Sequence, residues 1–244
     1  MNIWEQGIDT VLFDKDGTLI DLPSIWIPWV EDTVRYLQRM QMDISIDEAK
    51  RAVGVNLSDG GVDPKSPLAI ASIQESIIIF AFLLFQKGVA WDKAIIYSGE
   101  SIAYADERQN CSKDLKIVDG ISNLLAEMRG RGLKLGVLTA DDTDKARKQL
   151  EILQLASYFD FIIGSDLVEK GKPFPDMAYL ARDVYMVNLE RAAIIGDTSA
   201  DIQLGKLSSL KMTIGIASYT EGKAEHLQEA DYIIRSYSEL LGSE

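Results

Sequence analysis

Residues 11–19 read VLFDKDGTL: an apolar run ends in two aspartates, Asp14 and Asp16, which Gly17 and Thr18 follow. Side chains alternate along a strand, so two aspartates at this spacing share a face while the strand continues. Gly17 ends the strand, and both carboxylates are then expected on a loop beyond its carboxyl end, where open α/β sheets place their ligands. Two hard oxygen donors so close together suit Mg²⁺, and they also suit a nucleophile paired with a proton donor.

Short apolar runs recur along the second half of the chain, with helical patterns between them. Together with residues 10–13 they predict strands at 133–138, 159–163, 192–195, 212–216 and 232–234. Strands that alternate with helices are typical of a parallel sheet with right-handed crossovers. We therefore predict an α/β fold with a Rossmann-like three-layer core around one parallel sheet.

Residues 22–112 break this alternation. Prolines and a turn-rich loop punctuate the region, at Pro23, Pro28 and 58–64. The remaining segments have helical patterns, at 33–40, 66–86 and 92–108. The simplest account is an all-helical cap domain inserted after the first strand, at 22–112, which leaves 1–21 and 113–244 as the core.

The charge balance limits the partners that the chain can bind. The formal net charge is −13 at pH 7. Nucleic acid and anionic membranes both require a basic face, so neither is an expected partner. The net charge also gives no overall attraction for an anionic substrate, so a phosphate would have to meet local positive charge.

Cysteine and histidine are scarce in this sequence. Because Cys111 is the only cysteine, no intrachain disulfide can form, and a reducing compartment, the cytoplasm, is expected. His226, the only histidine, is interpreted as a surface residue, so mechanisms built on a histidine pair are excluded.

No segment has the pattern of a membrane span or a signal peptide. The most apolar run, 77–85, is about half the ~20 residues that cross a bilayer, and it predicts a buried helix. The amino terminus lacks the basic residues that open a signal peptide. The sequence therefore favours a globular protein in the cytoplasm.

Four segments with polar side chains fall towards the ends of predicted strands. They are DKDGT at 14–18, TA at 139–140, EKGKPFPD at 169–176 and GDTSAD at 196–201. The third supplies a lysine, Lys172, on a proline-bounded loop before a helix. Because the carboxyl ends of parallel strands meet at one edge of a sheet, these side chains are expected to surround one small site.

These segments and their order resemble the motifs of the haloacid dehalogenase superfamily of phosphohydrolases. An isolated DxD pair is weak evidence, but the ordered set of DxDGT, T, K and GDxxxD is specific. The inserted region is similar to the helical C1-type cap of phosphoglycolate phosphatase and β-phosphoglucomutase relatives. The resemblance covers the predicted core from about residue 9 to the last strand.

The resemblance implies a role for the polar residues of these segments. Asp14 is the nucleophile that takes the phosphoryl group, and Asp16 protonates the leaving oxygen and then activates water. Thr139, Ala140 and Lys172 bind the phosphate, although Ala140 stands where many relatives have asparagine and offers no polar side chain. Positive charge is needed here because a carboxylate alone would repel the phosphate.

The resemblance also implies one Mg²⁺, held by Asp14, Asp197 and the backbone carbonyl of Asp16. Gly17 lets the backbone bend so that its amides can face the phosphate. Three residues are expected to support the site: Gly17, Thr18 and Asp201.

Each of these residues also has an ordinary structural interpretation. Asp14 and Asp16 would suit a turn or a helix cap. Thr139 would suit a cap at a strand end, and Lys172 a solvated surface lysine. Asp201 would suit a first-turn acid favoured by the helix dipole. The ordered set of segments favours the catalytic interpretation.

One departure from the family pattern, at Lys15, and one pair of aromatic residues stay open. Lys15 replaces the apolar residue often found between the two aspartates, and we expect its side chain to point away and pair elsewhere, without a catalytic role. Trp26 and Trp29 would either line a substrate entrance or pack between the two domains.

Together the residues and the resemblance predict a Mg²⁺-dependent phosphatase that hydrolyses a small soluble phosphomonoester through an aspartyl phosphate. The expected substrate is phosphoglycolate-like or a sugar phosphate, and the expected state is a monomer or homodimer. The enzymatic alternative is a phosphomutase of the β-phosphoglucomutase type. Alternatives of other classes are a phosphoacceptor signalling domain and a non-catalytic binding protein.

Overall fold

The computed structural model describes residues 6–58, 61–63, 65–109, 115–218 and 224–241. Cys111 lies outside these ranges. The chain forms two compact units: a core unit, Met1–Asp21 with Lys116–Glu244, and a helical unit, Leu22–Leu115. Each unit is described separately below.

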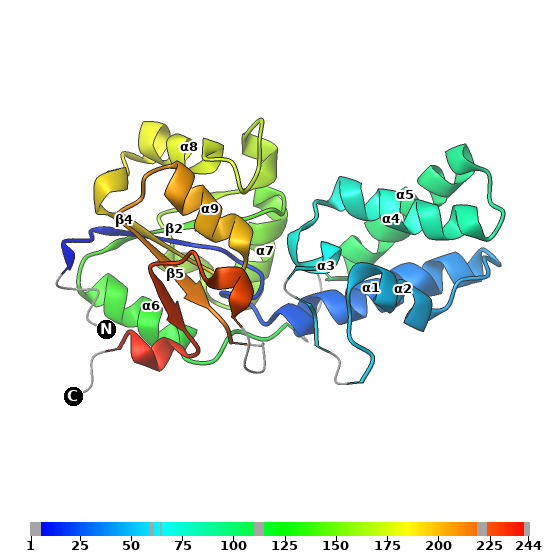
Figure 1. Cartoon of the computed structure of the whole chain (residues 1–244), viewed down its shortest axis with the longest axis horizontal. Helices are drawn as coiled ribbons and strands as arrows, with labels where there is room; N and C mark the ends of the chain where they lie inside the picture. The colour runs from blue at the N-terminus through cyan, green and yellow to red at the C-terminus, as the bar shows by residue number, and fades with distance from the viewer. Residues whose placement is uncertain (1–5, 59–60, 64, 110–114, 219–223, 242–244) are drawn as a thin grey trace. The chain divides into compact units, whose positions relative to one another are not determined.

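The core unit is built on one parallel sheet. Its strands are β1 (Thr10–Phe13), β2 (Lys134–Leu138), β3 (Phe161–Ile163), β4 (Ala192–Gly196), β5 (Met212–Ile216) and β6 (Tyr232–Ile234). Their order across the sheet is β3-β2-β1-β4-β5-β6 (Figure 1). The predicted strands are therefore confirmed, and so is the α/β fold.

The central strands are apolar because both faces of the sheet are covered. All residues of β1 and β4 are buried, as expected for strands of a parallel sheet. In the register, Phe13 lies beside Val137 of β2 and beside Ile195 of β4. Residues that follow these three strands therefore emerge together at one edge.

Helices cover both faces of this sheet. They are α6 (Ile121–Gly130), α7 (Thr143–Ile152), α8 (Asp176–Tyr185) and α9 (Ser199–Leu207). Met177 of α8 and Leu204 of α9 share a buried cluster with Leu12, Leu138 and Ile194, so α8 and α9 cover the same face. Helix α6 lies on the opposite face (Figure 1). The result is the expected three-layer arrangement.

Short 3₁₀ helices complete the core unit. They are η2 (Ala156–Tyr158), η3 (Ser165–Leu167), η4 (Leu189–Arg191), η5 (Glu225–Leu227) and η6 (Tyr237–Glu239). Two of them, η5 and η6, bring side chains to the site from the last part of the chain, as shown below.

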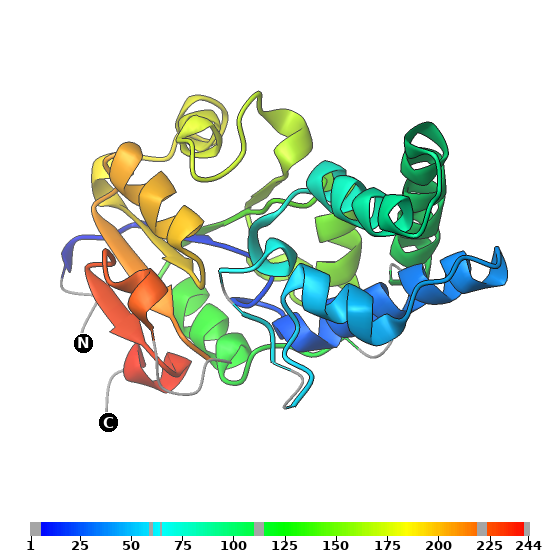
Figure 2. The same ribbon diagram turned by 45° about the vertical axis from the view of Figure 1, so that its right-hand side comes forward.

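The helical unit contains α1 (Leu22–Arg39), α2 (Ile46–Val53), α3 (Pro67–Ile70), α4 (Ile73–Gln86) and α5 (Trp91–Gln109). Helix α5 packs against both α1 and α4 (Figure 2). Trp29 of α1 is buried inside this unit, where its ring meets Phe80 edge-on at 6.0 Å and its indole N–H donates to Asp106 at 2.8 Å. Trp26 packs edge-on against Trp29 at 5.2 Å. Trp29 is thus a core residue of its own unit.

Two expectations for this region are wrong in detail. Pro23 and Pro28 do not interrupt the chain, because both lie within α1. The apolar segment 66–86 is two helices, since Ser72 caps α4 in a capping box with Glu75.

Helix α4 is also only partly buried. Phe80 and Leu84 are fully buried, whereas Phe82 and Phe85 are each 51% exposed. Among the described residues, no helix has the length and hydropathy needed to cross a membrane.

Candidate active site

Asp14 is positioned by the last hydrogen bond between β1 and β4. Its backbone N–H donates to the carbonyl of Ile195 at 2.9 Å, and Asp14 as a whole is only 7% exposed. Asp197 follows Gly196 at the end of β4, the strand next to β1. The pairing of two adjacent parallel strands therefore brings Asp14 and Asp197 together.

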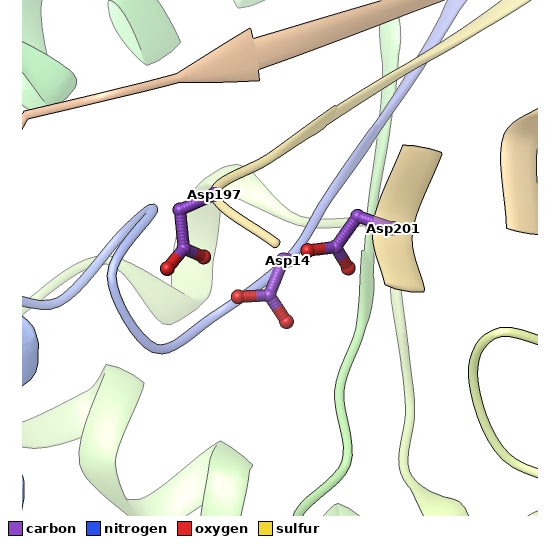
Figure 3. A group of neighbouring side chains, drawn as sticks. All are labelled: Asp14, Asp197 and Asp201. Atoms are coloured by element: carbon purple, nitrogen blue, oxygen red, sulfur yellow. The ribbon is translucent and has the colours of Figure 1, made fainter. Parts of the chain in front are cut away.

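Three buried carboxylates gather at this edge. Asp14, Asp197 and Asp201 each offer an oxygen, and these oxygens lie within 4.8 Å of one another (Figure 3). Asp14 comes from the end of β1, Asp197 from the end of β4 and Asp201 from the first turn of α9. We call this group the acid cluster.

Asp201 combines the structural and the functional interpretation. Thr198 is the N-cap of α9, and it forms a capping box with Asp201. In this box the Thr198 hydroxyl donates to Asp201 Oδ2 at 2.6 Å. The other oxygen, Oδ1, accepts from Lys172 at 2.6 Å. One carboxylate thus caps the helix and belongs to the acid cluster.

Lys172 is the cation of the cluster. Its side chain is 7% exposed, and Nζ donates to Asp14 Oδ1 as well as to Asp201. The lysine lies on the loop between η3 and α8, where the Lys172–Pro173 peptide bond is cis. The structure therefore brings Lys172 to the acid cluster, in place of the solvated surface position that was the alternative.

The electrostatics of the cluster favour an additional cation. Burial, Asp201 and Asp16 raise the pKa of Asp14 to about 7 in spite of the attraction of Lys172. Burial alone would lower the pKa of Lys172, but Asp14 and Asp201 raise it well above its usual value. Three buried acidic side chains share one ammonium group, so the cluster has more acidic than basic groups. Hard oxygen donors with excess negative charge fit a divalent metal ion.

The turn after β1 touches the acid cluster directly. Gly17 has φ +84°, and a Cβ at this position would lie 2.2 Å from Asp197 Oδ2. The Thr18 hydroxyl donates to Asp197 Oδ1 at 3.0 Å. Only glycine accommodates both the left-handed backbone and the close approach. Gly17 and Thr18 therefore both lie against the carboxylate of Asp197.

Two residues whose contacts local sequence patterns did not predict lie beside Thr18 and Asp197. The buried Tyr237 hydroxyl donates to the carbonyl of Thr18 at 2.7 Å. Burial first, and then the nearby Asp197 and Asp14, raise the pKa of Tyr237 well above its usual value, so it remains a neutral donor. His226 is half-buried, and its Nε2 lies 3.0 Å from the carbonyl oxygen of Asp197. His226 is thus partly exposed and also contacts the backbone of Asp197.

Asp16 and Lys15 differ from expectation. Lys15 does point into the protein, but its Nζ pairs with the adjacent Asp16 and with Asp141 at 3.0 Å. Burial lowers the pKa of Lys15, whereas Asp16 and Asp141 raise it above its ordinary value, so the lysine is charged. The expectation that Lys15 pairs away from Asp16 is wrong.

Thr139 and Ala140 follow β2 at the same edge of the sheet. Thr139 is buried, and its Oγ1 accepts from the N–H of Asp141 at 3.1 Å, which stabilises the turn. The hydroxyl does not cap α7, because the N-cap of that helix is Asp142, and the hydroxyl proton can still be donated to a ligand. Ala140 is exposed, so its backbone can approach a ligand without obstruction.

Comparisons with known proteins agree on one family. The model of the haloacid dehalogenase-like hydrolases matches residues 8–208. A phosphoglycolate phosphatase of Aquifex aeolicus (strain VF5) is 33% identical over 213 residues, 86% of this chain and 86% of that protein. The probable phosphatase IndB of Dickeya dadantii (strain 3937) is 26% identical over 238 residues, 96% of this chain and 92% of that protein.

A solved structure agrees with the fold. The crystal structure of a predicted phosphoglycolate phosphatase from Haemophilus somnus 129pt superposes with a TM-score of 0.74 at 15% identity. The match covers 96% of this chain and 97% of that one. At this identity the likeness concerns the fold alone.

Proposed function

The chain belongs to the haloacid dehalogenase-like hydrolases, and on that premise we propose that it removes phosphate from a small soluble phosphomonoester with the help of Mg²⁺. The observation that carries the proposal is the contact of Lys172 with both Asp14 and Asp201 at the edge where β1 and β4 end. A nucleophilic carboxylate, a phosphate-binding cation and a metal-binding acid cluster are thus adjacent.

The first step of the reaction uses Asp14 and Asp16. A carboxylate oxygen of Asp14 attacks the phosphorus, and the bond from phosphorus to the leaving oxygen breaks. Asp16 supplies the proton that the leaving oxygen takes. The products of this step are the free alcohol and an aspartyl phosphate on Asp14.

The second step regenerates the enzyme. Water attacks the phosphorus of the aspartyl phosphate while Asp16, now ionised, accepts a proton from it. The bond between phosphorus and Asp14 breaks, inorganic phosphate leaves, and both carboxyl groups return to their starting states. Burial raises the pKa of Asp16 while Lys15 lowers it, and the net shift is upward, which suits a group that must both give and take a proton.

Neutralisation of the phosphate oxygens is divided between protein and metal. Lys172, Thr139 and the backbone at Ala140 would bind the phosphate. Asp14, Asp197 and the Asp16 carbonyl would hold Mg²⁺, with Asp201 in support. The metal, when bound, supplies positive charge that lets the carboxylate approach the phosphate.

The substrate class follows from the relatives and from the charge. Among the relatives, one is named for phosphoglycolate, a small phosphate monoester that also has a free carboxylate. A chain of net charge −13 offers little general attraction for large polyanions, so the substrate is a small phosphorylated metabolite of the cytoplasm. The helical unit would act as a cap that limits the size of the substrate and excludes water.

A phosphate-release assay tests this proposal. The purified protein is incubated with an aryl phosphate and with a panel of phosphorylated metabolites, with Mg²⁺ and with a chelator. We expect release of inorganic phosphate that the chelator abolishes and Mg²⁺ restores. An isomerised sugar phosphate without free phosphate would indicate a phosphomutase instead. A long-lived phosphoprotein without turnover would indicate a phosphoacceptor domain.

A further inference from the structure

The fully buried Lys15 lies between the two catalytic aspartates in the sequence. We propose that Lys15 is a positioning residue whose ammonium group, fixed by Asp141 and Gln149 of the core unit, holds the carboxylate of Asp16 in place for proton transfer. This inference rests on the proposed function. It gives a role to Lys15, a residue to which the resemblance to the family assigns none.

The ammonium group of Lys15 meets three oxygens. Nζ donates to Asp16 Oδ1 and, at 2.6 Å, to Gln149 Oε1, and it lies 3.0 Å from Asp141 Oδ2. Gln149 is on α7, and Asp141 is in the turn before it. Two of the three N–H donors of the lysine are thus used in hydrogen bonds, and the contact with Asp141 is an ion pair. The Lys15 side chain is therefore fixed from two directions that are independent of Asp16.

The charges around Lys15 form a balanced group. Asp141 also pairs with Lys145, at 3.2 Å, so two lysines face two aspartates. We call Lys15, Asp16, Asp141 and Lys145 the buried charge network. A buried ammonium without partners would be strongly destabilising, and an apolar side chain would fill the same volume without that cost. The presence of a charged residue here points to a role in holding a specific partner.

Asp16 is the accessible end of this network. Its side chain is 17% exposed, against 0% for Lys15 and 4% for Asp141. Oδ1 contacts Lys15, and part of the Asp16 side chain remains exposed. An acid or base must lie within hydrogen-bond reach of the proton it moves, so fixing its rotamer preserves that geometry.

The two steps of the reaction depend on Asp16 to different degrees for an aryl phosphate. A nitrophenolate leaves readily without a proton, so formation of the aspartyl phosphate needs little help from Asp16. Hydrolysis of the intermediate still requires a base to activate water. A misplaced Asp16 should therefore slow the second step more than the first, and the phosphorylated enzyme should accumulate.

The test compares Lys15→Met with Lys145→Met. Both variants remove one lysine that pairs with Asp141, and Lys15 is the one whose Nζ hydrogen-bonds to Asp16. For Lys15→Met we expect kcat on nitrophenyl phosphate to fall by about 10- to 100-fold without a rise in KM. We also expect acid-quenched protein to carry a phosphoryl group on the peptide that contains Asp14. For Lys145→Met, kcat should stay within about twofold of the unmodified protein.

A second variant addresses stability. If Lys15→Met does not fold, Lys15→Met combined with Asp141→Asn keeps the network balanced in charge, and it should show the same loss of kcat and the same accumulation. Full activity of Lys15→Met, an equal loss in Lys145→Met, or failure of both Lys15 variants to fold would overturn the proposal. Unmodified protein that releases no phosphate would instead contradict the proposed function, so the two failures are distinguishable.

Discussion

In the proposed mechanism, Lys172 would serve both the stability and the chemistry of the site. It pairs with Asp14 and Asp201, which offsets part of the repulsion within the acid cluster. Under the proposal, the same ammonium would face the oxygens of a bound phosphate while the carboxylates would hold the metal ion. The lysine would then already lie at the phosphate position before the substrate binds.

Asp197 allows a direct test of metal binding. Its side chain is fully buried and accepts from Thr18, so it has a fixed position in the acid cluster. We expect Asp197→Asn to raise the Mg²⁺ concentration needed for half-maximal activity by at least about 10-fold, because a charged metal ligand is lost. The Mg²⁺-induced rise in melting temperature should also shrink, which gives a readout without catalysis.

A matched control for Asp197 is Asp144→Asn. Asp144 is an exposed acid in the first turn of α7, outside the acid cluster. Asp144→Asn should leave unchanged both the Mg²⁺ concentration needed for half-maximal activity and the Mg²⁺-induced rise in melting temperature. An Asp197→Asn variant with an unaltered Mg²⁺ requirement would remove Asp197 from the metal site.

Asp141 makes stability depend on pH. Burial raises its pKa, but Lys145 and Lys15 outweigh burial and lower it from 3.8 to about 2. A carboxyl group with a lowered pKa stabilises the fold fully above its unfolded pKa, and this contribution is lost as the pH falls through the folded value. Asp141→Asn should lower the free energy of unfolding by about 2 kcal/mol at pH 7.

Urea unfolding between pH 7 and pH 3 checks the Asp141 prediction. The difference in the free energy of unfolding between the unmodified protein and Asp141→Asn should become smaller below about pH 4. Asp183, an exposed acid that pairs with Arg182 at the surface, is the control, and Asp183→Asn should make no measurable difference. If the free energy of unfolding of Asp141→Asn differs from that of the unmodified protein by the same amount at every pH, the charge of Asp141 does not stabilise the fold.

At the scale of the element, the turn after β1 is the most constrained segment of the site. Gly17→Ala should reduce activity on the order of 100-fold, because the new Cβ would displace the carboxylate of Asp197. Gly132→Ala is the matched control, since Gly132 also has a positive φ, +77°, but a Cβ there would meet nothing within 4 Å.

The pair of glycine variants separates backbone strain from the contact with Asp197. Each alanine at a positive φ should destabilise the fold by roughly 1–2 kcal/mol, as measured by chemical unfolding. Only Gly17→Ala should also lose activity. Equal activity in the two variants would mean that the approach of Gly17 to Asp197 is unimportant.

The elements also show what the sequence can and cannot predict. The strands and the four strand-end segments were predictable, because buried parallel strands are continuous apolar runs with polar residues directly after them. Helix α1 was not, because its prolines indicate breaks, whereas burial of Ile25, Trp29 and Val30 on one face favours a continuous helix. In α1 the burial of the apolar face therefore outweighs the low helix propensity of proline.

Contacts between residues far apart in the sequence could not be predicted from local patterns. Tyr237 supports Thr18 across 219 positions of the chain, and no periodicity links the two residues. The pairing of Lys15 with Asp141 and Gln149 likewise depends on how α7 packs in the core unit. Such contacts require the packed structure, while the residue types of the acid cluster were visible as a motif.

At the scale of the whole molecule, the core unit contains every residue assigned to the reaction. The helical unit leaves and re-enters it at adjacent positions: the N–H of Asp21 donates to the carbonyl of Lys116 at 2.8 Å, and Ile20 pairs with Ile117 in an antiparallel bridge. A short linker can therefore join residues 21 and 116 without moving the sheet.

Removal of the helical unit tests its role. We expect a core with a short glycine-serine linker between residues 21 and 116 to unfold cooperatively and to retain slow Mg²⁺-dependent hydrolysis of an aryl phosphate. Its kcat/KM values for different metabolites should become more alike, because the cap would no longer select among them. Circular dichroism and phosphate release measure both outcomes. A linked core with undiminished substrate selectivity would contradict the assignment of the helical unit as a cap.

The central claim is that Asp14 takes the phosphoryl group, and rapid acid quenching followed by peptide mass spectrometry tests it most directly. During turnover with Mg²⁺, the peptide that contains Asp14 should carry one phosphoryl group, and Asp14→Asn should show neither this modification nor release of phosphate while keeping its melting behaviour. A folded Asp14→Asn variant that releases phosphate at the full rate would contradict the claim.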